Sequence, residues 1–82
     1  MTYHLKEIPR GEFGELSKIK EEILEAEDAE EQNNRLMVLI ELSDIIGAID
    51  GYLVKHYPDF QLNDLITMAK ATQRAFNSGA RK

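Results

Sequence analysis

Apolar side chains recur with helical spacing along most of the chain. Leu16, Ile19, Ile23 and Ala26 are spaced three, four and three residues apart, which is the pattern of one buried helix face. This spacing predicts a first helix over about residues 14–31. A third helix over about 62–77 is predicted by a second stripe of this kind, formed by Leu62, Leu65, Ile66, Ala69 and Phe76. No segment shows the sustained alternation of a strand, so we expect an all-α fold with three main helices.

The segment between these two helices is the most apolar part of the chain. It predicts a second helix over about 34–56, which ends before Pro58 because proline disfavours helix in the residue that precedes it. A helix that is apolar on most sides must be buried, and two short neighbours supply little surface for this. We therefore expect homo-oligomerisation to complete a helical bundle. The side chains concerned are Leu39, Leu42, Ile45, Ile46, Ile49 and Leu53.

The length of 82 residues favours a single domain. Pro9 and Gly11 predict an irregular segment over 1–13, followed by a helical domain over 14–78 and a short tail over 79–82. The chain has no Cys, which excludes disulfides and thiolate zinc sites. Its two histidines, His4 and His56, are too few and too far apart in the sequence to predict a histidine metal site.

The net charge of −5 argues against binding to DNA or RNA, which attract basic surfaces. The N-terminus lacks the apolar core of a signal peptide. Arg35, Glu41, Asp44 and Asp50 interrupt the longest apolar run, which argues against a membrane span. We expect a soluble, cytoplasmic protein without a nucleic-acid or membrane partner.

Glu41 and Asp44 stand out because they interrupt the apolar second helix. At 100° per residue they lie about 60° apart, on a stripe that also holds Gly47, Ala48 and Gly51. These small residues are expected to leave space beside the two acids. Buried carboxylates are costly unless they are paired or bound to a cation.

The first helix offers a matching pair, Glu22 and Glu25. Glu22 borders the apolar stripe, whereas Glu21 lies about 100° further round and is expected to be more exposed. A short turn makes the two helices antiparallel neighbours, so four carboxylates would face one gap. Such an all-oxygen, highly charged site suits Mg²⁺ or Mn²⁺.

Simpler interpretations stay open. Acid-rich helices commonly have solvated faces, and "EAEDAEE" (25–31) has the composition of one. The acids of the second helix can instead pair with Lys18, Lys20 or Arg74. On the third helix Lys70 and Arg74 share a polar stripe suited to phosphate, although bases near a helix C-terminus are also favoured by the helix dipole.

Glu21-Glu22-x-x-Glu25 and Glu41-x-x-Asp44, separated by 15 residues, resemble a known signature. It is the EExxE…ExxD motif of the MazG-like all-α nucleoside triphosphate pyrophosphohydrolases. "GEFGELSKIKEE" (11–22) and "LNDLITMAKATQRAFNSGAR" (62–81) are also similar to small phage and bacterial members, so the resemblance spans residues 11–81. One difference is that Ile23-Leu24 follows the paired acids, where many members have Gly.

The resemblance implies an enzyme that hydrolyses an NTP or dNTP to the monophosphate and pyrophosphate, working as a homodimer or homotetramer. Glu22, Glu25, Glu41 and Asp44 would be the catalytic residues that hold Mg²⁺, with Mn²⁺ as the alternative ion. Lys70 and Arg74 would contact phosphate, and Glu21 would help to orient water. The alternatives are a non-catalytic acidic helical interaction module and a nucleotide-binding member without turnover.

Overall fold

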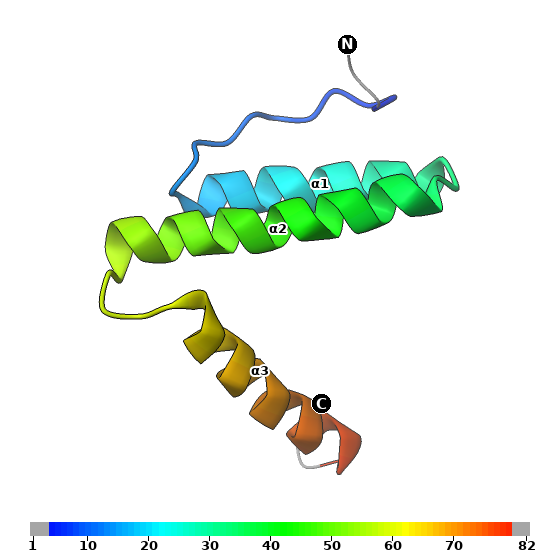
Figure 1. Ribbon diagram of the computed structural model, residues 1–82. Coiled ribbons are helices and arrows are strands. Elements are labelled where there is room, and N and C mark those ends of the chain that lie inside the picture. The colour runs from blue at the N-terminus through cyan, green and yellow to red at the C-terminus, as the bar shows by residue number, and fades with distance from the viewer. Residues whose placement is uncertain (1–3, 80–82) are drawn as a thin grey trace.

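The computed structural model describes residues 4–79, and this part of the chain forms three helices joined by short connections (Figure 1). They are α1 (Leu16–Glu31), α2 (Arg35–His56) and α3 (Leu62–Asn77). Residues 4–79 contain no strand, so the all-α prediction is confirmed, and each helix begins within two residues of its expected start. Residues 1–3 of the predicted N-terminal segment and 80–82 of the predicted tail lie outside the described residues.

Local hydrogen bonds explain where the helices begin. Asn33 adopts a positive φ of 56° in the turn after α1, a conformation that Asn tolerates better than most residues. The side chain of Asn34 then accepts a hydrogen bond from the Met37 N–H at 3.1 Å and caps α2. At the start of α3, Asp64 accepts a bond from the Gln61 N–H at 2.8 Å. Asn33 and Asn34 thus form the short turn between α1 and α2 that the sequence predicted, and the bond between Gln61 and Asp64 caps α3.

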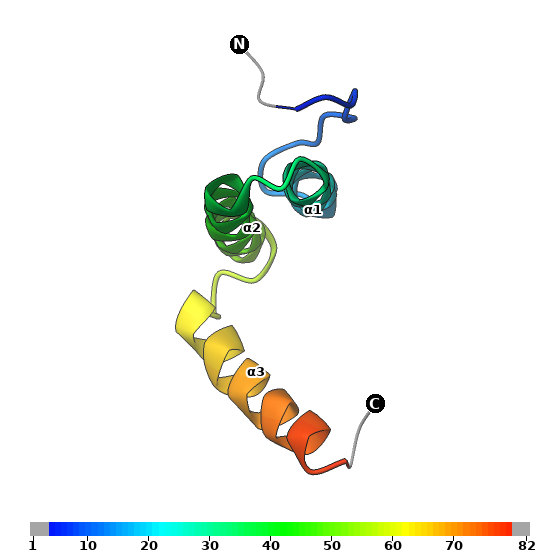
Figure 2. The same ribbon diagram turned by 90° about the vertical axis from the view of Figure 1, so that its right-hand side faces the viewer.

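The α1–α2 hairpin is the centre of the structure (Figures 1 and 2). An N-terminal segment (residues 4–13) runs along one side of it, and α3 leaves from the opposite side. In the described part of the chain α3 contacts α2 but not α1. Among residues 4–79, no helix is both long and apolar enough to cross a membrane.

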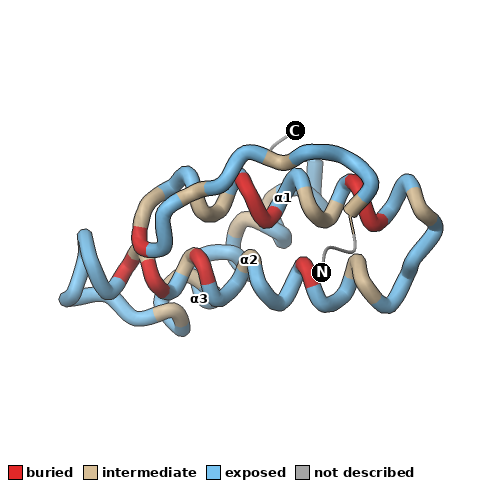
Figure 3. Tube along the Cα trace, turned by 90° about the horizontal axis from the view of Figure 1, so that it is seen from above, coloured by how far each residue is buried: buried red, intermediate tan, exposed pale blue. Residues whose placement is uncertain are grey.

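The apolar core within one chain is thin. Ala29, Ala48 and Leu53 are its buried apolar residues in the described range, and α3 buries none (Figure 3). The predicted apolar stripes remain largely open to solvent, as Leu39 is 63% and Ile46 52% exposed. A single chain therefore does not bury its second helix.

The N-terminal segment is irregular in residues 4–13, as predicted, but it is attached to the hairpin. The Gly11 N–H donates to Glu21 Oε1 at 2.6 Å, and the Glu12 N–H donates to Ser17 Oγ at 3.1 Å. The Phe13 ring lies against Gly51 on α2, where a Cβ would meet the ring. Gly11 itself lies so close to the Ser17 carbonyl that a Cβ would overlap the backbone.

This close approach makes Gly11 a test of how the segment is attached. Gly11→Ala should lower the free energy of unfolding by about 1–3 kcal/mol, because the Ser17 backbone cannot move aside as a flexible side chain would. Gly47→Ala is the matched control, since nothing lies within 4 Å of its added Cβ. It should instead stabilise α2 by about 0.5–1 kcal/mol. Urea unfolding measures both changes, and equal effects would contradict the attachment described here.

Candidate metal centre

The structure gathers the four predicted carboxylates between α1 and α2. We call Glu22, Glu25, Glu41 and Asp44 the acidic cluster. Glu22, Glu41 and Asp44 each offer an oxygen, and these oxygens lie within 4.8 Å of one another. Glu22 and Glu25 form a second group of this kind with Glu21. The antiparallel turn has thus brought both acid pairs to one place, as the helical spacing predicted, while their role as metal ligands stays a prediction.

Two members of the acidic cluster are deeply buried. Glu22 is 5% and Glu41 is 4% exposed, whereas Glu25 is half-buried and Asp44 is exposed. Oε2 of Glu22 and Oε2 of Glu41 are buried and have no hydrogen-bond partner among the described residues. Buried polar atoms in proteins are nearly always hydrogen-bonded, so two unsatisfied oxygens in one cluster require an explanation.

The surroundings of these acids raise their affinity for positive charge. Burial, followed by hydrogen bonding and repulsion from Glu25 and Glu22, raises the pKa of Glu41 from 4.5 to about 8. The pKa of Glu25 is also raised, mainly by burial and by the charge of Glu22. Near neutral pH Glu41 therefore holds a proton in the absence of a cation. A divalent ion would replace this proton on binding.

Lys18 compensates part of the negative charge. Its Nζ lies 3.1 Å from Glu21 Oε2 and 3.2 Å from Glu22 Oε1. In the described part of the chain Lys18 thus pairs with acids of its own helix rather than with Glu41 or Asp44. One oxygen of Glu22 is satisfied in this way and the other is not.

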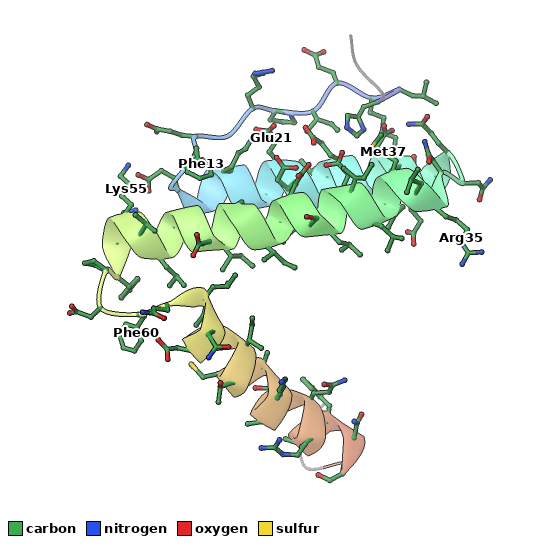
Figure 4. All side chains as sticks on the ribbon, in the orientation of Figure 1. Phe13, Glu21, Arg35, Met37, Lys55 and Phe60 are labelled. Carbon is green, nitrogen blue, oxygen red and sulfur yellow. The ribbon has the colours of Figure 1, made fainter. Side chains whose placement is uncertain are left out.

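Glu21 is more buried than the sequence predicted. It is 7% exposed, and Figure 4 shows its side chain between α1 and the N-terminal segment. Burial would raise its pKa, but the Gly11 N–H and Lys18 outweigh this and lower it. The prediction of a more exposed Glu21 was wrong because it considered α2 as the only neighbour of α1. Its predicted role in orienting water is untested, and its observed role is to hold the N-terminal segment.

Asp28 and His4 are the two residues at this site that the sequence did not identify. Asp28 is 2% exposed, so "EAEDAEE" is not a solvated face at this position. Its Oδ2 lies 3.0 Å from the Leu5 N–H, from His4 Nδ1 and from Gln32 Nε2. Burial would raise the pKa of Asp28, but these donors outweigh burial and lower it.

His4 lies directly beside the acidic cluster. Its Nε2 is 3.6 Å from Glu25 Oε2 and 3.6 Å from Glu41 Oε1. The sequence did not predict this contact between His4 and the acidic cluster. His4 belongs to an irregular segment, in which no periodicity indicates a neighbour. The other histidine, His56, pairs with Glu15 at 2.9 Å near the end of α2.

Other parts of the predicted site are not assembled within one chain. Lys70 and Arg74 are exposed on α3, which leaves the hairpin on the side opposite the N-terminal segment (Figures 1 and 2). The structure does not bring them to the acidic cluster, and their contact with phosphate stays a prediction. Of the small residues expected to leave space, Gly47 is open, but Ala48 is buried and Gly51 is covered by the Phe13 ring.

Comparison of the chain with family models, with curated proteins and with solved structures found no match.

The raised pKa of Glu41 predicts an unusual pH dependence of stability. Between pH 4.5 and about 8 the folded chain holds a proton at Glu41 that the unfolded chain has released. Stability of the metal-free protein should therefore fall as pH rises through this range, with a melting temperature at least about 5 °C lower at pH 8.5 than at pH 5.5. Thermal unfolding followed by circular dichroism in the presence of a chelator measures this.

Glu41→Gln should remove most of this pH dependence because the amide does not titrate. Glu27→Gln is the matched control, since Glu27 is exposed on the same hairpin. A parent protein equally stable at both pH values would contradict the raised pKa of Glu41.

Proposed function

We propose that the chain is a Mg²⁺-dependent nucleoside triphosphate pyrophosphohydrolase. The observation that carries the proposal is the pair of buried, unsatisfied oxygens of Glu22 and Glu41 inside a cluster of carboxylates from two helices. The MazG-like signature that the same residues form in the sequence supports it. The reaction would convert an NTP or dNTP and water into the monophosphate and pyrophosphate.

The donor set of the acidic cluster fits Mg²⁺. All of its side chains offer carboxylate oxygens, the ligands that this hard cation prefers. Three acids share one group and two of them are buried, so they do not all ionise near neutral pH unless a cation lies between them. Asp44 is exposed, so the cluster has a solvent-facing edge from which a phosphate group can approach.

In the proposed reaction the metal ion and the side chains of the acidic cluster have different roles. Bound Mg²⁺ would supply neutralisation of the triphosphate and a water of lowered pKa. Glu22, Glu25, Glu41 and Asp44 would hold the ion at the α1–α2 interface. Glu22 and Glu41, the buried members of the cluster, would lie on the side of the reacting phosphate that faces away from bulk water. The exclusion of water would strengthen the electrostatic contacts there.

The proposal includes a homodimer or homotetramer. Leu42 and Ile45 of α2 and Ile23 of α1 line an open groove of about 400 Å³ on the hairpin. Ile66, Met68 and Phe76 on α3 are also largely exposed. Contiguous apolar surface on a small chain is typical of an interface. A second copy would cover this surface, and its α3 would supply Lys70 and Arg74 as phosphate donors that one chain does not bring to its own cluster.

Glu41→Gln and Asp44→Asn should each reduce Mg²⁺-dependent pyrophosphate release by at least roughly 100-fold, because each removes a ligand charge. The assay screens nucleoside triphosphates with Mg²⁺ or Mn²⁺ and measures pyrophosphate. Asp50→Asn is the matched control: it makes the same chemical change at an exposed position of α2 and should leave the rate within about 2-fold. Undiminished activity in both cluster variants would exclude the assignment.

The same variants separate the enzyme from its alternatives. Exposed apolar surface also suits a non-catalytic interaction module, which predicts no pyrophosphate release and no effect of Mg²⁺ on melting. A nucleotide-binding member without turnover predicts a rise in melting temperature with Mg²⁺ and nucleotide but no product. In either metal-binding case the rise should be absent from Glu41→Gln.

The exposed face of α2 predicts the oligomeric state. The parent should sediment as a dimer or tetramer, and Ile46→Glu should shift it to the monomer, because a charge would have to be buried in the interface. Leu5→Glu is the matched control, as Leu5 is 82% exposed in the N-terminal segment and lies outside the helices. Analytical ultracentrifugation measures both. A monomeric parent at micromolar concentration would contradict the oligomer.

A further inference from the structure

His4 places an imidazole nitrogen beside the acidic cluster, whose own side chains offer only carboxylate oxygens. His4 is half-buried, and its Nε2 lies 3.6 Å from both Glu25 Oε2 and Glu41 Oε1. The three side chains each place one ligand atom within 4.8 Å of the other two. This group is distinct from the all-carboxylate group of Glu22, Glu41 and Asp44, and Glu41 belongs to both.

The contact with Asp28 sets the orientation of the imidazole. Asp28 Oδ2 lies 3.0 Å from His4 Nδ1 and accepts from the Leu5 N–H and from Gln32. A carboxylate can only accept, so His4 donates its Nδ1–H to Asp28. In the neutral ring the lone pair is then on Nε2, the atom that faces the two glutamates. Histidines that bind metals are held by a carboxylate in this way.

A second observation indicates a ligand at this place. Glu41 is 4% exposed; its Oε1 is the oxygen that lies 3.6 Å from His4 Nε2, and the other oxygen of the same carboxylate, Oε2, is buried without a hydrogen-bond partner among the described residues. Two atoms bound to one ion at about 2.1 Å are roughly 3–3.5 Å apart, close to the 3.6 Å separations seen here. Small side-chain rotations would complete the site.

We propose that His4 gives the acidic cluster a nitrogen ligand, so that His4, Glu25 and Glu41 bind a divalent transition-metal ion. The inference rests on the proposed function, because it assigns a second ion to the same cluster. Imidazole nitrogen favours the later first-row metals, whereas Mg²⁺ prefers oxygen. Glu41 belongs to both groups, so its carboxylate would join the site that contains His4 to the all-carboxylate site of Glu22, Glu41 and Asp44. The irregular N-terminal segment thereby becomes part of the metal site.

Co²⁺ is the probe, because it accepts imidazole and reports its ligands spectroscopically. Titration calorimetry of the metal-free, full-length chain should give a Co²⁺ dissociation constant that rises roughly 10–100-fold in His4→Gln, while that for Mg²⁺ changes less than about 3-fold. The Leu5 N–H, which does not depend on the side chain of residue 4, still donates to Asp28, so the segment keeps this attachment. His56→Gln is the matched control, since His56 pairs with Glu15 away from the cluster, and it should bind both ions as the parent does.

Proton NMR of the Co²⁺-loaded protein gives an independent readout. The parent and His56→Gln should show a strongly shifted, exchangeable imidazole N–H resonance, which should be absent from His4→Gln. Unchanged Co²⁺ affinity in His4→Gln, together with a retained resonance, would overturn the inference while Mg²⁺ binding and pyrophosphate release left the proposed function intact. A parent that binds neither Mg²⁺ nor Co²⁺ would overturn both.

Discussion

The repulsion between carboxylates in the α1–α2 interface is the constraint on which the rest of the structure depends. The hairpin buries two alanines, Ala29 and Ala48, and it also buries Glu22 and Glu41. A typical hairpin of this length would bury large apolar side chains at that interface. Here the apolar contribution is small and the buried charge is costly. The acidic cluster therefore lowers the stability of the fold. A destabilising concentration of charge of this kind is characteristic of a functional site.

The N-terminal segment relieves this repulsion only in part. The Leu5 and Gly11 N–H groups satisfy Asp28 and Glu21, the acids at the outer edge of α1, and both carboxylates have lowered pKa values as a result. The inner acids are treated differently, since the pKa values of Glu25 and Glu41 are raised. These acids of α1 and α2 thus fall into two classes. Those that receive backbone donors attach the segment, and those that do not remain available for a cation.

The sequence predicted the parts of this arrangement that follow from periodicity. Helical spacing and Pro58 set the helices, and the i, i+3 pairs together with the short turn placed Glu22, Glu25, Glu41 and Asp44 beside each other. It did not predict Asp28 or His4, because their contacts depend on an irregular segment that folds back over α1. A helical wheel shows which residues share a face but not which loop will cover that face. The exposure of Leu39 and Ile46 within one chain has a similar explanation. Periodicity marks an apolar face without indicating what covers it.

The described part of the chain leaves two kinds of unsatisfied groups: the carboxylates between α1 and α2, and the exposed apolar side chains of the three helices. The carboxylates lack positive charge, which a small ion would supply. The exposed apolar side chains lack apolar contact, which only a much larger surface would supply. Since α1 and α2 carry both kinds of groups, anything that separates the two helices would disturb both. In the proposed assembly, a second copy packed against the exposed apolar side chains would hold the carboxylates together against their repulsion, and this would couple assembly to the affinity of the acidic cluster for a cation.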